Sequence, residues 1–203
     1  MSQAPILVGI GGYKQSGKDT AAQALVDFRG FKRLAFADPV REVTFALHPF
    51  LRDIPYEDRD IPKLELGGRT LRSYLVEVGE GAREKDPYVW INIVLGRAKE
   101  LFRRGRSVVI SDLRHRNEFA AVAGAGGVRL WVSNPAARPG NDITEQARPE
   151  WADSTIHNDG AVRDLHLRTI RQVDAWVLSR KELLGYGAAP AAMAPQRELA
   201  RHG

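Results

Sequence analysis

A glycine-rich segment between an apolar run and an amphipathic helix constrains the fold of this chain most strongly. Residues Ile6–Ile10 are apolar and rich in branched side chains, which is typical of a buried parallel strand. The segment Gly12–Thr20 follows at once, in the order Gly, four residues, Gly-Lys, Asp-Thr, and apolar residues then recur at helical spacing from Lys18 to Phe28. A strand that leads through such a loop into a helix predicts a phosphate-binding loop.

The residue types in this loop suit an anion. Gly12 and Gly17 allow a tight turn whose amides point inward, and the following helix N-terminus adds partial positive charge. Lys18 adds a full charge that reaches β- and γ-phosphates. Asp19 stands where Ser or Thr usually places a hydroxyl on Mg²⁺; it either holds Mg²⁺ through water or caps the helix, and Thr20 is a candidate contact for an α-phosphate. The alternative is a glycine-rich turn without function.

Strand-like and helix-like segments alternate along the rest of the chain. Strands are expected at Val108–Ile110, Val128–Val132 and Ser154–His157, and helices at Pro39–Leu47 (with Asp38 as the N-cap), Leu71–Ala82, Tyr88–Arg104, Arg116–Ala123 and Val162–Leu184. Prolines and glycines predict an irregular excursion over residues 48–69 and a mobile loop over Asn134–Glu150. The alternation predicts an α/β fold, a parallel sheet of about five strands flanked by helices, in one domain over residues 1–186 with a flexible tail over 187–203.

A second polar motif follows the strand Val108–Ile110. Asp112 and Arg114 stand just past this strand, at the edge of a parallel sheet where ligands bind. The carboxylate is suited to orient Mg²⁺ or its waters, and the guanidinium to stabilise charge on a transferred phosphoryl group. The alternative is a polar strand end with a surface arginine.

Arginines that begin helices or flank loops form a third candidate feature. Their guanidinium groups grip phosphate with two parallel hydrogen bonds, although any single one is more often a solvated surface residue. They are Arg41, Arg72, Arg138 and Arg148. The aromatic residues Tyr74 and Trp90 either stack on a ligand or, as their apolar neighbours favour, pack in the core.

Composition excludes several classes of function. The chain has no cysteine, so disulfide scaffolds, cysteine zinc sites and cysteine nucleophiles are excluded. The net charge of +5 is scattered among acidic residues, so no nucleic-acid partner is expected. No apolar run approaches the roughly 20 residues of a membrane helix, and the N-terminus does not resemble a signal peptide, so we expect no membrane partner and a cytoplasmic location. A homodimer is the commonest assembly for such a chain.

An ordered set of motifs resembles the bacteriophage deoxynucleoside monophosphate kinases. It begins with Gly12–Thr20 and covers about residues 6–175, most of the chain. The further matching segments are Ala37-Asp38-Pro39-Val40-Arg41, Leu71-Arg72 through Gly79 with Trp90, Ser111–Glu118, the lid motif Asn141-Asp142-Ile143-Thr144-Glu145, and Asn158-Asp159-Gly160.

The resemblance implies a P-loop kinase with a helical acceptor-binding region over about residues 38–105 and a lid over about 134–150. It implies transfer of the γ-phosphoryl group of ATP, with Mg²⁺, to deoxynucleoside 5′-monophosphates, for phage nucleotide supply in a host cytoplasm. The implied ATP-binding residues are Gly12, Gly17, Lys18, Asp19, Thr20, Asn158 and Gly160, and the implied acceptor-binding residues are Lys14, Val40, Arg41, Arg72, Gly79, Trp90, Asp112, Arg114, Glu118, Thr144 and Glu145. Catalysis falls to Lys14, Lys18, Asp112 and Arg114, and Asp19 and Asp112 hold Mg²⁺ through water.

Two departures concern the lid and the loop. Asp142 stands where the family often has a histidine, and Gln15 where some members have a basic residue. Dephospho-coenzyme A kinase, or another P-loop kinase with a small acceptor, is the nearest alternative, although it usually ends the loop Gly-Lys-Ser. An NTPase linked to nucleic acid and a non-catalytic nucleotide-binding module are alternatives from other classes.

Overall fold

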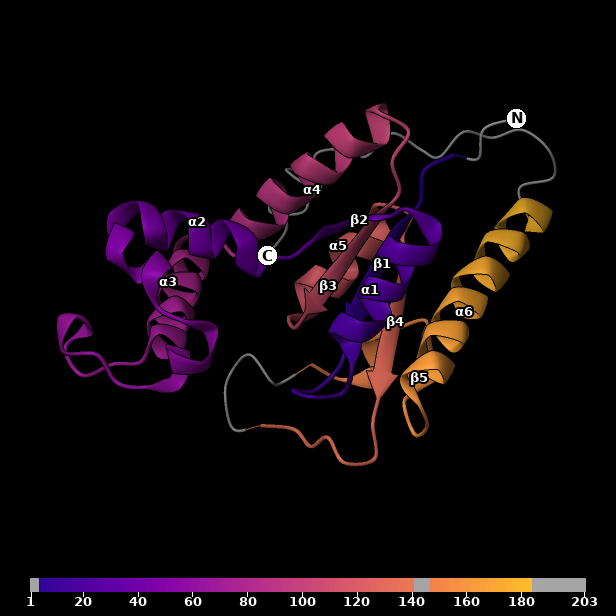
Figure 1. Ribbon diagram of the computed structural model, residues 1–203. Helices are drawn as coiled ribbons and strands as arrows, with labels where there is room; N and C mark the ends of the chain where they lie inside the picture. The colour runs from indigo at the N-terminus through magenta and orange to yellow at the C-terminus, as the bar shows by residue number, and fades with distance from the viewer. Residues whose placement is uncertain (1–3, 141–146, 184–203) are drawn as a thin grey trace.

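A five-stranded parallel sheet forms the centre of the molecule (Figure 1). The computed structural model describes residues 4–140 and 147–183. The strands are β1 (Leu7–Gly11), β2 (Lys32–Leu34), β3 (Val108–Leu113), β4 (Val128–Ser133) and β5 (Ser154–His157), in the order β2-β3-β1-β4-β5. Every pairing is parallel, and β1 lies in the middle of the sheet. The predicted fold class is therefore confirmed.

Strand β2 was not among the segments expected from the sequence. It has three residues, of which Lys32 and Arg33 are exposed, so it carries no apolar run. Its only pairing among the described residues is with β3, where Lys32 lies opposite Val108 and Leu34 opposite Ile110. The partner strand, rather than local propensity, makes this segment a strand.

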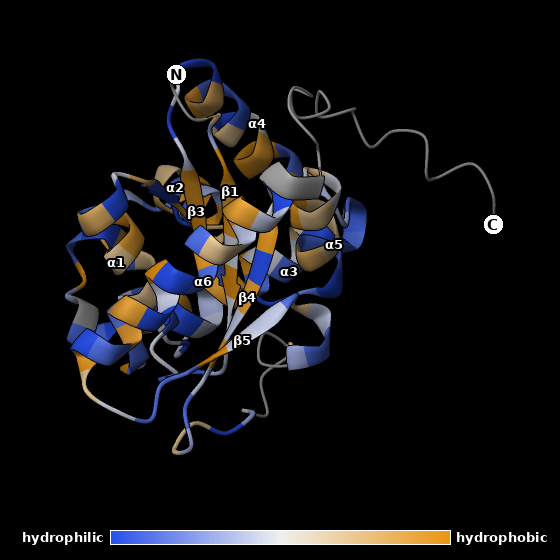
Figure 2. Cartoon of the chain, turned by 90° about the vertical axis from the view of Figure 1, so that its right-hand side faces the viewer, coloured by the Kyte–Doolittle hydropathy of each residue, from blue (hydrophilic) through white to orange (hydrophobic). Residues whose placement is uncertain are grey.

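Helices cover both faces of the sheet (Figures 1 and 2). One face packs under α4 (Val89–Arg103) and α5 (Arg116–Gly124), and its core includes Ile91 and Phe119. The other packs under α1 (Lys18–Arg29) and α6 (Val162–Leu183), around Leu25 and Leu165. Strands β1 and β3 are buried on both faces, as their apolar runs predicted. None of the helices within residues 4–140 and 147–183 combines the length and hydropathy needed to cross a membrane.

The segment between β2 and α4 forms a helical lobe beside the sheet, on the left of Figure 1. It consists of α2 (Ala37–Leu47), the 3₁₀ turns η1 (Pro49–Asp53), η2 (Tyr56–Asp60) and η3 (Leu64–Leu66), and α3 (Leu71–Lys85). A small core of Leu51, Leu66 and Leu71 holds these pieces together. The excursion predicted over residues 48–69 is thus a series of short turns around its own apolar cluster.

The start of α2 differs from the prediction. The helix begins at Ala37 and its N-cap is Phe36, so Asp38 is not the N-cap. Asp38 lies in the first turn, and its carboxylate accepts a hydrogen bond from the N–H of Ala35 at 2.9 Å. The N-cap prediction was wrong because the backbone N–H groups at this helix start have a tertiary acceptor, described below.

The expected lid and tail are described only in part. Residues 134–140 are irregular, and η5 (Pro149–Trp151) is a short 3₁₀ turn. The rest of the predicted lid motif, including Asp142, Thr144 and Glu145, lies outside the described residues, as does the predicted tail over 187–203.

Candidate active site

The loop between β1 and α1 can be built only with glycine at two positions. Gly12 has φ 153°, and a Cβ there would lie 2.7 Å from the carbonyl oxygen of Val132. Gly17 has φ 97°, and a Cβ there would lie 2.4 Å from Nδ2 of Asn158. Both positions combine a backbone conformation that favours glycine with a close neighbour. The structure therefore gives a physical reason for the glycine spacing of the motif.

The loop places the N-terminus of α1, which has no side-chain cap, at the edge of the sheet. The N-cap of α1 is Gly17, which supplies no side-chain hydrogen bond, so the alternative that Asp19 caps the helix is wrong. Gln15 has φ 64°, and the N–H of Ser16 donates to the carbonyl of Tyr13 at 3.1 Å. First-turn N–H groups without a side-chain cap are a site for anions.

Two charged side chains begin α1. Lys18 is buried, whereas the side chain of Asp19 is 70% exposed. Oδ1 of Asp19 lies 3.7 Å from Nη2 of Arg33, which comes from β2. The buried cation is thus fixed beside the loop, and the carboxylate faces solvent.

Asn158 braces the loop from the end of β5. Its Nδ2 donates to the carbonyl oxygen of Ser16 at 2.9 Å, and its own N–H donates to the carbonyl of Ser133 at 2.7 Å. Gly160 lies two residues before α6, where a Cβ would lie 2.9 Å from Oδ2 of Asp164. These contacts give Asn158 a structural role in addition to the adenine contact that the resemblance implies.

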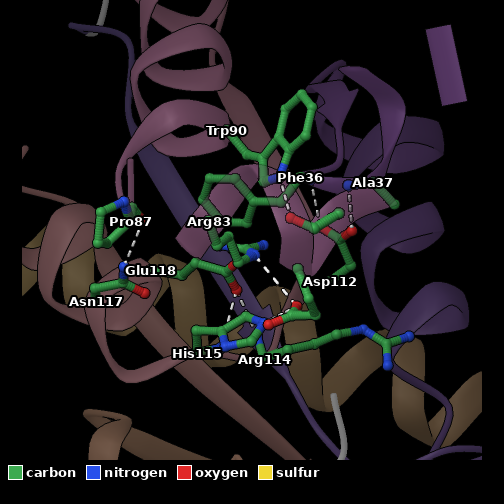
Figure 3. Close-up of polar contacts among 12 residues, drawn as sticks. Phe36, Ala37, Arg83, Pro87, Trp90, Asp112, Arg114, His115, Asn117 and Glu118 are labelled. Carbon is green, nitrogen blue, oxygen red and sulfur yellow. Dashed lines mark hydrogen bonds and ion pairs between the residues drawn. The ribbon is translucent and has the colours of Figure 1, made fainter. Parts of the chain in front are cut away.

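Asp112 connects the sheet to the helical lobe (Figure 3). Its Oδ1 accepts from the N–H of Phe36 at 2.7 Å and its Oδ2 from the N–H of Ala37 at 2.9 Å. Burial raises the pKa of this carboxyl group, and the two backbone hydrogen bonds oppose that shift. One carboxylate from β3 therefore fixes the start of α2, and this contact replaces the expected N-cap.

A buried ion pair connects α3 to α5 below this point (Figure 3). Nη2 of Arg83 donates to Oε1 of Glu118 at 2.7 Å, and the N–H groups of Arg114 and His115 donate to Oε2 at 2.7 and 3.1 Å. Burial raises the pKa of Glu118 to about 7, while the positive charge of Arg83 and the backbone donors oppose it. Burial, with Arg83 and Arg114, lowers the pKa of His115 to about 4, so this imidazole is neutral at pH 7. Glu118 thus holds the segment that carries Arg114.

Trp90 of α4 packs against α3 in the helical lobe. The residue is 3% exposed, and its Nε1 donates to the carbonyl oxygen of Gly79 at 3.0 Å. Gly79 is buried, and a Cβ there would lie 3.6 Å from Val40. Trp90 therefore packs beneath α3, whereas Gly79 and Val40 face the cleft described next.

A cleft of about 1030 Å³ lies between the loop, the ends of the strands and the helical lobe. Many residues singled out from the sequence line it: Lys14, Lys18, Asp19, Val40, Arg41, Arg72, Gly79, Asp112, Arg114 and Glu118. Gly12, Gly17, Thr20, Trp90, Asn158 and Gly160 do not belong to the lining. Nine lysines or arginines and four acidic residues line the cleft, so its walls attract anions.

The sequence interpretation missed four cleft arginines. Arg33 comes from the unexpected strand β2, Arg52 and Arg59 from the turns η1 and η2, and Arg83 from α3. The sequence held a signal only for Arg83, which follows Arg72 and Gly79 at helical spacing. The other three depend on how the short turns and β2 are placed.

The carboxylates of the cleft fit a magnesium ion carried by phosphate oxygens. No group of three or more His, Cys, Asp or Glu side chains that suits a metal ion occurs in the part of the chain that the structure describes. Mg²⁺ keeps several waters and binds through one or two carboxylates plus substrate phosphates. Asp19 is exposed beside the loop, whereas both oxygens of Asp112 accept backbone hydrogen bonds. Asp19 is the better suited of the two.

Comparison with known proteins agrees with this architecture. No family model matches the chain. A protein of Acanthamoeba polyphaga mimivirus named "Putative deoxynucleotide monophosphate kinase" is 28% identical over 191 residues, which cover 83% of this chain and 96% of the relative.

Two solved structures share the fold. The protein TT1252 of Thermus thermophilus is 24% identical, with 86% of this chain and 98% of that chain covered and a TM-score of 0.50. A sugar kinase of Janibacter sp. HTCC2649 is 15% identical, with 84% and 95% covered and a TM-score of 0.50. The ordered loop, strand and cleft features and these similarities identify the chain as a phosphotransferase with the P-loop kinase fold.

Proposed function

We propose that this kinase transfers the γ-phosphoryl group of ATP to a deoxynucleoside 5′-monophosphate and forms the diphosphate. The observation that carries the proposal is the single cleft that contains both the loop residues Lys14 and Lys18 and the lobe residues Arg41 and Arg72. A donor held at the loop and a phosphorylated acceptor held by the lobe would meet there. The name of the mimivirus relative supports the same acceptor class.

The side chains of the cleft divide the work of in-line transfer. Amides of the loop and Lys18 hold the donor phosphates, and Lys14 lies between donor and acceptor. Arg41 and Arg72 bind the acceptor phosphate, and Arg114 offsets the charge of the group in transfer. The acceptor oxygen belongs to a phosphate that is already ionised near pH 7, so no strong general base is needed.

Asp112 and Glu118 act by positioning. Asp112 fixes the helix that carries Arg41, and Glu118 fixes the segment that carries Arg114. Mg²⁺, when bound beside Asp19, neutralises charge on the donor phosphates. Positioning and charge neutralisation supply most of the rate in this class of reaction.

The proposal includes the architecture that the resemblance implies. Residues 38–105 form the acceptor-binding region and 134–150 a lid that excludes water over the bound nucleotides. Rapid ATP hydrolysis in the absence of an acceptor would count against such a lid. We further propose a single domain over residues 1–186, and a small-molecule enzyme of the cytoplasm, as a monomer or homodimer, without a nucleic-acid partner.

A coupled assay for ADP formation tests the proposal. ATP with Mg²⁺ is offered with each deoxynucleoside monophosphate, each ribonucleoside monophosphate and dephospho-coenzyme A. Turnover with deoxynucleoside monophosphates supports the proposal, and turnover with dephospho-coenzyme A alone refutes it.

Lys18→Ala should lower kcat on the order of 10²–10⁴-fold, because a buried charge beside the phosphates is removed. Lys99→Ala, on the exposed side of α4, is the matched control and should leave the rate unchanged. Full turnover by the Lys18 variant would contradict the role of the loop.

A further inference from the structure

The turn that carries Lys14 contains a backbone conformation that is unfavourable for an L-side chain. The N–H of Ser16 donates to the carbonyl oxygen of Tyr13 at 3.1 Å and closes a four-residue turn. Lys14 and Gln15 form the middle of this turn, and both line the cleft. Gln15 has φ 64° and is the only residue other than glycine with a positive φ in the described part of the chain. Contacts around the turn must therefore maintain this conformation.

Both ends of the turn are attached to strands that follow later in the chain. At the Ser16 end, Nδ2 of Asn158, just past β5, donates to the carbonyl oxygen of Ser16 at 2.9 Å. At the other end, the ring of Tyr13 meets the indole of Trp131 in β4 edge to face, with 5.0 Å between the ring centroids and 86° between the ring planes. This is a preferred geometry for an aromatic pair. The two contacts therefore lie on either side of Lys14 along the turn.

The indole of Trp131 is a firm support for Tyr13. Trp131 is 2% exposed and lies opposite Gly11 in the sheet. Because Gly11 has no side chain, the rings of Phe119 and Trp131 approach the end of β1; a Cβ at Gly11 would lie 2.5 Å from one and 3.3 Å from the other. Phe119 also packs against Trp151, with 5.8 Å between the ring centroids. Tyr13 thus rests on a buried aromatic cluster that joins β4, α5 and η5.

Tyr13 is placed to support the turn rather than to touch a ligand. Its ring is partly buried against the core of the sheet, whereas the two residues that follow it line the cleft. Tyr13 itself does not belong to that lining. Its carbonyl oxygen closes the turn and its ring packs on Trp131, so the position of the ring determines the path of the backbone into Lys14.

We propose that Tyr13 is a positioning residue, whose packing on Trp131 fixes the turn so that Lys14 reaches the space between the two nucleotides. The inference rests on the proposed function, in which Lys14 lies between donor and acceptor. A misplaced ammonium group would leave the donor bound, since Lys18 and the N-terminus of α1 remain, but it would stabilise the charge of the group in transfer less well. Loss of the ring contact should therefore lower kcat rather than weaken the binding of ATP.

Steady-state kinetics and a double-mutant cycle test this assignment. Tyr13→Leu should lower kcat with a deoxynucleoside monophosphate about three- to tenfold, the range for the loss of one aromatic pair, and change KM for ATP by less than about twofold. Tyr13→Phe keeps the ring and should have a kcat within about twofold of the wild type. In a Lys14→Ala background, Tyr13→Leu should change kcat by less than about twofold, because the side chain that it positions is gone.

Phe28→Leu is the matched control. Phe28 lies in the last turn of α1, where its ring contacts that of His166 with 5.7 Å between the ring centroids. It does not belong to the cleft lining. The variant removes an aromatic contact from the helix that follows the loop, at the end away from the turn, so kcat should equal that of the wild type.

Several results would overturn the assignment. An equal fall in kcat from Tyr13→Leu in the wild-type and Lys14→Ala backgrounds would show that Tyr13 does not act through Lys14. Unchanged kinetics of Tyr13→Leu would show that the ring contact positions nothing, and a Tyr13→Phe variant as slow as Tyr13→Leu would assign the effect to the hydroxyl group. If Tyr13→Leu does not fold, Tyr13→Met takes its place with the same requirements.

Failure of the proposed function is recognised separately. A wild-type enzyme without turnover on any deoxynucleoside monophosphate would refute that function itself. A Lys14→Ala variant with the kcat of the wild type would refute the role of Lys14, and the inference for Tyr13 with it.

Discussion

Replacing Asp112 with asparagine tests the carboxylate that connects the sheet to the helical lobe. The native side chain accepts one backbone N–H on each oxygen, from Phe36 at 2.7 Å and Ala37 at 2.9 Å. Asparagine has one acceptor oxygen, so one of these N–H groups would face an NH₂ donor instead. The change removes one hydrogen bond to a charged group, about 1.5–3 kcal/mol, and leaves one buried donor unsatisfied, about 1–3 kcal/mol.

Part of this loss is offset because a neutral amide is easier to bury than a carboxylate. The raised pKa of Asp112 shows that burial disfavours its charge. We therefore expect the free energy of unfolding to fall by about 2–4 kcal/mol, measured by urea denaturation at pH 7.

Asp19→Asn is the control on stability, because that side chain is 70% exposed and lies 3.7 Å from its partner Arg33. It should change the free energy of unfolding by less than about 0.5 kcal/mol. If the free energy of unfolding of Asp112→Asn is within about 0.5 kcal/mol of that of the wild type, Asp112 does not fix the start of α2.

Three further perturbations follow from the geometry. The neutral form of His115 stabilises the fold fully above pH 6.5, and this contribution is lost as the pH falls towards the folded-state pKa of about 4. Between pH 7 and pH 4, the free energy of unfolding of the wild type should therefore fall by about 3 kcal/mol more than that of His115→Asn. An equal fall for the two proteins in urea denaturation would contradict this. Gly17→Ala forces a Cβ to within 2.4 Å of Asn158 at φ 97°, so the melting temperature should drop and ATP affinity weaken, and calorimetry that shows no change in either would remove the steric argument. Trp90→Phe leaves the buried carbonyl of Gly79 without its donor and should cost about 1–3 kcal/mol in urea denaturation, whereas equal stability would show that this contact contributes nothing.

The site is built largely from contacts between distant parts of the sequence. Asp112 reaches backbone groups 76 and 75 residues away, and Arg83 reaches a carboxylate 35 residues away. The contacts of Asp112 join β3 to the start of α2, and the contact of Arg83 joins α3 to α5. The position of the lobe over the loop therefore depends on a few buried polar groups as well as on apolar packing.

The sequence by itself determined the loop, the main helices and four of the strands. Gly12 and Gly17 allow the positive φ angles of the loop. Each apolar strand or amphipathic helix is encoded in a contiguous run of residues. These are local properties, so the residues that express them can be read in order along the chain. The resemblance added Glu118 and gave Arg41 and Arg72 an acceptor role, and the structure brings all three to the cleft that contains the loop.

Only the tertiary structure decided strand β2, the start of α2 and the presence of Arg33, Arg52 and Arg59 in the cleft. Strand β2 exists because β3 offers it a partner, and α2 begins where Asp112 accepts its first N–H groups. No pattern in a short window encodes a partner that lies dozens of residues away, since that partner is brought near only when the crossovers of the sheet have formed.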